Sequence, residues 1–284
     1  MRTFYAKTAY VIGGSSGIGL ETAKLLATAG ARVIIFARNV DKLQVAQQAI
    51  DAGGRGRSGY LSVDVTDHER VQAVMADART QFGPPHLLIN SAGRGSAYYF
   101  HDIDHAEFDR TLKINLYGTW NATAALAEHM PSGGHIVNVS SIAGFVGVFG
   151  FTGYSAAKFG VVGFSEALRS ELKPLGIRVS VLCPPDTDTP GLHTENLTKP
   201  AETMKISAGA RLMQPDQVAQ ALIRGLRKNR FMIIPGFDGK LTYYAKRLVP
   251  CLVRAIMDWD IKKFRMQKAA QPELVPLLGR FRIE

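Results

Sequence analysis

The chain has 284 residues, of which 46% are hydrophobic, and it carries a formal net charge of +10. This composition is that of a soluble globular protein, and the length suits one large α/β domain or two small ones. Its two cysteines, Cys183 and Cys251, lie far apart and have no metal-ligand spacing. They therefore argue against a disulfide framework and against a metal site, and they favour a reducing, cytoplasmic setting.

The sequence predicts neither a secretory signal nor a membrane-spanning segment. No pattern of a positive, an apolar and a cleavage region precedes the first expected strand, so we expect no secretory signal. The longest uncharged run, residues 136–157, is long enough for a membrane span. Glycine, serine and threonine interrupt it, however, which predicts a strand and a loop instead.

The first element is a short apolar run, residues 8–13, typical of a buried parallel strand. A glycine-rich turn follows it and leads into residues 20–29, where apolar residues recur at helical spacing. Glycines between a strand and a helix let backbone N–H groups approach a pyrophosphate, to which the helix N-terminus adds positive partial charge. A simple tight turn is the alternative, but the context favours dinucleotide binding. The residues expected to bind are Gly13, Ser15, Ser16, Gly17, Ile18 and Gly19.

The residues that follow the second expected strand, residues 32–37, indicate which nicotinamide cofactor is bound. An acidic residue at the end of this strand would bind the 2′-hydroxyl of an NAD ribose, and here Arg38 follows the strand instead. Arg38 can form a bidentate pair with a 2′-phosphate, and Lys42 can add a second positive charge. The sequence therefore predicts NADPH/NADP+ rather than NADH, the alternative being that both are solvated surface residues.

Strands and helices continue to alternate along the chain. A strand at 59–64 ends at Asp64 and Val65, where an adenine ring would lie, and a helix is expected from about 67 to 82. A strand at 86–90 closes in a turn of small residues, with Asn90, Ala92 and Gly93 expected to contact a ribose. A long helix at 107–129, strands at 135–140, 176–183 and 230–235, and a helix entered near 215 complete the pattern. This alternation predicts an α/β fold with a doubly wound parallel sheet.

The fifth strand and the helix after it carry the candidate chemistry. Tyr154 and Lys158 are four residues apart, so on a helix they share one face, where a cation favours the ionised phenol. Ser140 and Ser141 end the strand before that helix. The carboxyl ends of parallel strands are where open α/β sheets bind ligands, so we expect proton chemistry there.

Together these motifs resemble the classical short-chain dehydrogenases/reductases over residues 8 to about 235. The resemblance implies a Rossmann fold and a catalytic set of Asn115, Ser141, Tyr154 and Lys158. The spacing of thirteen between Ser141 and Tyr154 is the family's, which favours Ser141 over Ser140. It also implies that Pro184, Thr187 and Thr189 hold the nicotinamide end. Ile12 and Ser91 depart from the family's usual residues without touching the chemistry.

Residues 184–191 and 195–200 are similar to a narrower group, the 3-ketodihydrosphingosine reductases. That likeness implies NADPH-dependent reduction of 3-dehydrosphinganine, a long-chain lipid ketone, beneath a substrate lid at about residues 190–212. A short-chain reductase for another apolar carbonyl, such as a steroid or an acyl chain, is the alternative. An NADP(H)-binding regulatory protein without turnover is a second one, which the complete catalytic set disfavours.

We expect a catalytic domain at residues 1–239 and a basic amphipathic extension at 240–284. The extension contains ten Lys/Arg and only four Asp/Glu. Its apolar residues at helical spacing suit a helix pair broken at Pro250 on an anionic membrane surface. Packing on the protein's own core or on another subunit is an equal alternative. No nucleic acid is expected, although a basic tail is one feature of proteins that bind it. The family resemblance implies a homodimer or homotetramer.

Overall fold

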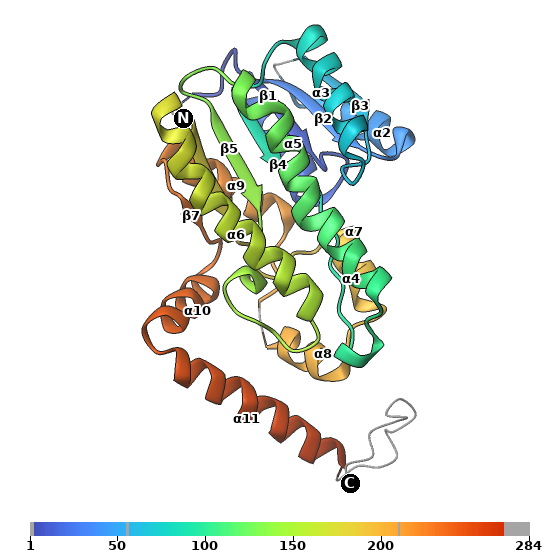
Figure 1. Ribbon diagram of the computed structural model, residues 1–284, viewed down its shortest axis with the longest axis vertical. Helices are drawn as coiled ribbons and strands as arrows, with labels where there is room; N and C mark the ends of the chain where they lie inside the picture. The colour runs from blue at the N-terminus through green and yellow to red at the C-terminus, as the bar shows by residue number, and fades with distance from the viewer. Residues whose placement is uncertain (1–2, 55–56, 210, 270–284) are drawn as a thin grey trace.

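The computed structural model of the protein describes residues 3–54, 57–209 and 211–269. Within these residues, seven parallel strands form one sheet in the order β3-β2-β1-β4-β5-β6-β7 (Figure 1). The strands are β1 (Thr8–Ile12), β2 (Arg32–Ala37), β3 (Ser58–Ser62), β4 (Leu87–Asn90), β5 (His135–Val139), β6 (Arg178–Leu182) and β7 (Met232–Ile233). The doubly wound parallel sheet that the sequence predicts is thereby confirmed.

Helices connect the strands and cover both faces of the sheet (Figure 1). Asn39, Asp67 and Asp104 begin α2, α3 and α4 by accepting a hydrogen bond from a backbone N–H of the first turn, the role these short polar side chains favour. The helices of this part are α1 (Gly17–Thr28), α2 (Val40–Asp51), α3 (His68–Phe82), α4 (His105–Leu112), α5 (Gly118–Leu126), α6 (Thr152–Leu172), α7 (Pro190–Asn196), α8 (Ala201–Ala208) and α9 (Pro215–Arg227).

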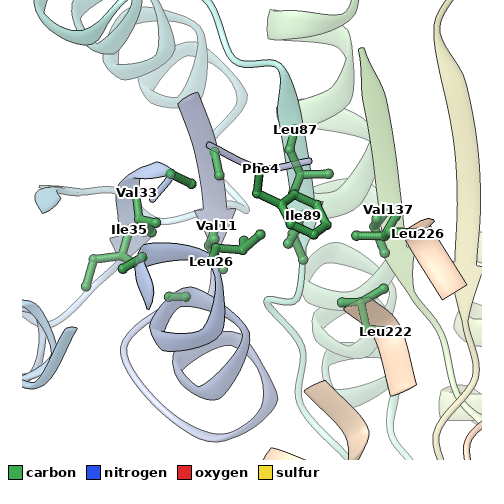
Figure 2. Close-up of a cluster of buried hydrophobic side chains, with 14 of the residues drawn as sticks. Phe4, Val11, Leu26, Val33, Ile35, Leu87, Ile89, Val137, Leu222 and Leu226 are labelled. Atoms are coloured by element: carbon green, nitrogen blue, oxygen red, sulfur yellow. The ribbon is translucent and has the colours of Figure 1, made fainter. Parts of the chain in front are cut away.

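Alternate side chains of the strands supply two apolar cores, one on each face of the sheet. On one face, Val11, Ile35 and Ile89 pack with α1 and α9 (Figure 2). On the other, Tyr10, Ile12 and their neighbours pack with α3, α5 and α6. Because both faces are covered, the central strands are apolar at nearly every position, as expected for a parallel sheet.

Beyond β7 the chain leaves the sheet as two helices, α10 (Phe237–Leu248) and α11 (Pro250–Ala269), with α11 lying beside α8 (Figure 1). The break at Pro250 is where the sequence predicts it. Residues 270–284 of the expected extension lie outside the described residues. Among the described helices, none is both long and apolar enough to cross a bilayer.

One apolar row of α10 and α11 faces solvent. We call it the C-terminal stripe, and each of its side chains is more than half exposed. Its members are Leu241, Tyr244, Leu248, Leu252, Ile256 and Trp259. Within the described residues, the stripe therefore does not pack on the protein's own core.

Candidate functional site

A cleft of about 530 Å³ opens at the carboxyl ends of the strands, where the strand order reverses between β1 and β4. Ligands of open α/β sheets bind at such a point. Most of the expected site residues line this cleft: Gly13, Ser15, Ser16, Gly17, Ile18, Arg38, Lys42, Asp64, Val65, Ala92, Gly93, Asn115, Ser141, Tyr154, Lys158, Pro184, Thr187 and Thr189. Two expected cofactor contacts, Gly19 and Asn90, do not line it.

The glycine turn leaves a backbone-lined space that fits a pyrophosphate. Gly13 has a φ of +79°, and a Cβ on it would lie 2.5 Å from the backbone nitrogen of Ala92. The side chain of Ser16 makes no cap at the start of α1, so that the helix's first N–H groups are left for a ligand. A Cβ on Gly19 would collide with the carbonyl oxygen of Gly13. Gly19 thus allows the helix to pack against the turn and does not itself face the cleft.

Asn90 supports the cleft from behind. Only 2% of it is exposed, and its Nδ2 donates to the hydroxyl of Thr123 at 2.9 Å and to Oδ1 of Asn138 at 2.8 Å. These bonds tie the end of β4 to β5 and α5. The next three residues, Ser91, Ala92 and Gly93, are the part of this turn that reaches the cleft.

The corner of the cleft after β2 is positively charged. The Arg38 side chain is 72% exposed, and its Nη1 lies 3.8 Å from the Asp64 carboxylate, which is a loose contact. Asn39 accepts a hydrogen bond from the N–H of Lys42 at 2.8 Å, which places the N-terminus of α2 beside Arg38. This corner contains the Arg38 guanidinium, the Lys42 ammonium and the positive N-terminal end of α2. Together these donors fit a phosphate group.

Helix α6 brings Tyr154 and Lys158 together. The Lys158 ammonium lies 5.5 Å from the centroid of the Tyr154 ring and donates to the carbonyl oxygen of Val139 at 3.0 Å. Burial lowers the pKa of Lys158 to about 8. The lysine is therefore held at the end of β5, directly beneath the phenol.

The pKa of Tyr154 differs from the sequence-based expectation. Burial raises it above its usual range, the negative charge of Glu195 raises it further, and a hydrogen bond with Ser141 acts in the opposite direction. Lys158 is not among the groups that shift this pKa, and its ammonium donates to the Val139 carbonyl. The phenol is therefore held protonated, the form from which a proton can be given.

The two serines after β5 have different roles. The Ser140 hydroxyl is buried and donates to the backbone carbonyl of Lys158 at 2.9 Å, which fixes α6 against the strand. The Ser141 side chain accepts a hydrogen bond from the N–H of Ala143 at 3.1 Å and is hydrogen-bonded with Tyr154. Of the two serines, Ser141 is thus the one hydrogen-bonded with the phenol, while the Ser140 hydroxyl is committed to the backbone of α6.

Asn115 lies in a π-helical turn, Lys113–Tyr117, that joins α4 to α5. Its Nδ2 donates to the carbonyls of Thr111 and Arg94, and its Oδ1 accepts from the N–H of Arg94. A Cβ on Gly93 would come within 2.9 Å of Oδ1 of Asn115 and 3.4 Å of the Lys158 ammonium. The glycine therefore allows the amide and the ammonium to approach each other, and a π-turn is a local feature often found at functional sites.

The segment after β6 completes the cleft. The Thr187 hydroxyl donates to the carbonyl of Pro185, and Thr189 caps α7 by accepting from the N–H of Leu192. Helices α7 and α8 lie in the stretch where the sequence predicts a lid, and Glu195 and Ile206 line the cleft.

An ionic cluster in this segment was not predicted from the sequence. The Lys199 ammonium lies 2.9 Å from Glu195 and 3.8 Å from Asp186, and the Glu195 and Lys199 side chains are at least nine-tenths buried. Their separation of four residues is the only signal in the sequence, and it is equally typical of an exposed helix pair.

The chain belongs to the short-chain dehydrogenase family, whose model matches residues 7–200. It is thus an oxidoreductase that acts on a ketone or alcohol, and the family implies a nicotinamide cofactor.

A 3-ketodihydrosphingosine reductase of Mus musculus is 39% identical over 235 residues, which cover 81% of this chain and 71% of the relative. One of Dictyostelium discoideum is 37% identical over 250 residues, covering 81% and 75%. The crystal structure of the apo form of LigD from Sphingobium sp. strain SYK-6 superposes with a TM-score of 0.72 at 26% identity, covering 90% of this chain and 97% of LigD.

Proposed function

We propose that this enzyme reduces the C3 ketone of 3-dehydrosphinganine to the alcohol of sphinganine, with NADPH as the reductant. The observation that carries the proposal is the placement of Tyr154 over Lys158 and in hydrogen-bonding contact with Ser141, in a chain whose relatives named above are reductases of this ketone. A helical lid, with apolar residues such as Leu192 and Ile206 lining the cleft, suits an alkyl chain.

Each residue of the site has a separate role in ketone reduction. The bound cofactor supplies the hydride. The Ser141 hydroxyl donates a hydrogen bond to the carbonyl oxygen, and Tyr154 donates a proton to the same oxygen as negative charge develops on it. Lys158 would stabilise the tyrosinate that remains and hydrogen-bond the nicotinamide ribose, and Asn115 would orient Lys158 through a water, as the family resemblance implies. Pro184, Thr187 and Thr189 hold the nicotinamide end.

Substitution of the acid tests the reaction. Purified protein with 3-dehydrosphinganine should oxidise NADPH, and Tyr154→Phe should lower kcat by at least about 100-fold, the usual contribution of a general acid. NADPH binding, followed by the fluorescence of the reduced nicotinamide, should be retained. The control is Tyr117→Phe, whose phenol is exposed outside the cleft. Unchanged turnover in the Tyr154 variant, or a substrate panel in which a steroid or an acyl ketone is preferred, would contradict the proposal.

Arg38 carries the preference for NADPH within this proposal. Arg38→Ala removes the guanidinium from the phosphate-binding corner, so the KM for NADPH should rise by about tenfold or more, while the KM for NADH should change little. Lys24→Ala is the control, because Lys24 pairs with Glu21 on α1 outside the cleft. Equal changes for the two cofactors would show that Arg38 does not read the 2′-phosphate.

We also propose that α10 and α11 rest on an anionic membrane surface through the C-terminal stripe. These helices carry eight Lys/Arg and three Asp, so a basic face accompanies the exposed apolar one. That combination is typical of interfacial helices. Since α11 lies beside α8, the lid would face the bilayer from which a long-chain ketone comes (Figure 1).

Vesicle co-sedimentation tests this contact. The protein should sediment with vesicles containing anionic phosphatidylglycerol and less with pure phosphatidylcholine. The double variant Ile256→Glu/Trp259→Glu should lose most of the binding, because a charge at the apolar boundary is unfavourable. Leu175→Glu is the control, since Leu175 is equally exposed but lies in the turn before β6. Equal sedimentation of all three proteins would contradict the proposal and leave a second subunit as the partner of the stripe.

A further inference from the structure

Glu195 is a buried carboxylate in the wall of the cleft. It lies on α7, its side chain is 9% exposed, and one oxygen, Oε1, accepts from the Lys199 ammonium at 2.9 Å. No hydrogen bond to the other oxygen, Oε2, is found among the described residues, and Glu195 lines the cleft. A buried carboxylate with one free oxygen is costly, and a cationic ligand would satisfy it.

The surrounding charges leave this end of the cleft negative. Glu195 and Asp186 share a single cation, Lys199, so the three side chains sum to one negative charge. Arg94, which lines the cleft next to Gly95, is paired with Glu107 at 2.9 Å. Of the other cations that line the cleft, Lys158 is held beneath Tyr154 by the Val139 carbonyl, and Arg38 and Lys42 lie in the corner after β2.

Glu195 is also close to the reacting position. Its charge acts directly on the Tyr154 phenol, and both side chains line the same cleft. On the far side, a Cβ on Gly95 would collide with Oε2, so only glycine at position 95 leaves room for this carboxylate. The carboxylate is therefore fixed in place near the group that gives the proton.

We propose that Glu195 binds the ammonium group that neighbours the reacting ketone, and so selects α-amino ketones over plain ketones. This inference rests on the proposed function, because 3-dehydrosphinganine carries an amine on the carbon next to its carbonyl. With the ammonium at Oε2 and the carbonyl oxygen at Ser141 and Tyr154, two adjacent substrate groups are held at once. Charge-assisted pairing in a buried place orients the ketone as well as binding it.

The test compares two ketones of equal chain length, 3-dehydrosphinganine and 1-hydroxyoctadecan-3-one, which lacks the amine. The ratio of their kcat/KM values should favour the amine in the native enzyme. Glu195→Gln keeps the shape and the contact with Lys199 but removes the charge, so the ratio should fall by about tenfold or more. Glu195→Asp, which keeps the charge, should retain part of the preference.

Glu202→Gln is the matched control. Glu202 is a buried carboxylate on the neighbouring helix α8, but it bonds to Tyr99 and Arg265 and does not line the cleft, so its removal should leave the ratio unchanged. An equal loss for both ketones in Glu195→Gln would overturn the inference alone, because a merely structural role affects both. A native enzyme that reduces neither ketone would overturn the proposed function together with it.

Discussion

His135, the first residue of β5, is fully buried and uncharged. Its Nε2 lies 2.8 Å from the Ser180 hydroxyl, which itself donates to the carbonyl of Arg230 at 2.6 Å. The hydroxyl's hydrogen is thus committed, so Nε2 is the protonated nitrogen and donates to Ser180. Nδ1 has no partner among the described residues. Burial lowers the pKa of His135 to about 3.

This histidine should make the protein sensitive to acid. Unfolded, the ring binds a proton below its ordinary pKa of 6.5, whereas folded it stays neutral down to about pH 3. Between these two pH values the unfolded state binds more protons than the folded state. The contribution of His135 to the free energy of unfolding therefore falls by up to ~1.4 kcal/mol per pH unit as the pH is lowered. Urea denaturation at pH 7 and pH 5 should show a smaller pH effect in His135→Gln. His129→Gln, at an exposed site, is the control, and equal pH effects in all three proteins would contradict the argument.

The role of a single residue can be predicted from the sequence when it depends on residues nearby in the chain, and not when it depends on distant elements. The facing of Tyr154 and Lys158 follows from a spacing of four on one helix, and the glycine turn follows from its place between β1 and α1. The raised pKa of Tyr154 did not follow, because it depends on burial and on Glu195, which α7 brings back from forty-one positions along the chain. Asn90 likewise matched a motif, but its neighbours Thr123 and Asn138 bind its amide from other elements.

At the scale of elements, the order of strands and helices was predictable, while their interruptions were not. The expected helix at 107–129 is divided by the π-turn Lys113–Tyr117 and ends in a 3-10 turn. Its apolar spacing continues through the π-turn, so no local signal marks the extra residue. The turn places Asn115 near Gly93 and Arg94, an arrangement set by tertiary contacts.

Helix α11 clamps the lid helix α8. The guanidinium of Arg265 lies 3.0 Å from the Glu202 carboxylate and over the ring of Phe149, and the Tyr99 hydroxyl donates to the other Glu202 oxygen at 2.9 Å. Thr203, next on α8, donates to the Phe149 carbonyl. The Arg265 side chain is 53% exposed, so the ion pair alone is weak, but Glu202 is buried and needs its partners.

Removal of this clamp should loosen the lid without unfolding the protein. In Arg265→Ala, amide hydrogen exchange over α8 should become several-fold faster, and the KM for the long-chain ketone should rise while the KM for NADPH stays the same. Arg247→Ala is the control, because Arg247 contacts only Tyr243 among the described residues. Unchanged exchange over α8 would show that α11 does not restrain the lid.

At the scale of the whole molecule, the sheet places every part of the site at one edge, and the lid and the C-terminal helices gather at that same end (Figure 1). The outer side of the α4–α5 and α6 layer is left with exposed aromatic rings. Phe108, Tyr117, Trp120 and Phe159 are between 39% and 51% exposed, and α4 and the π-turn pack directly against α6. Large apolar side chains clustered on packed helices are typical of a subunit interface.

We propose that two copies of the chain pair through this aromatic face, as the family resemblance implies. A C2 dimer uses the same face of both subunits, so one charge introduced there is introduced twice at the interface. Trp120→Glu and Phe159→Glu should therefore each convert a dimer into a monomer in sedimentation velocity experiments, with the folded state verified by circular dichroism. Val45→Glu, at an exposed position on α2 across the molecule, should leave the dimer intact. A native protein that sediments as a monomer at micromolar concentration would contradict the interface, whereas a dimer insensitive to both changes would direct attention to the C-terminal stripe as the surface that joins the subunits.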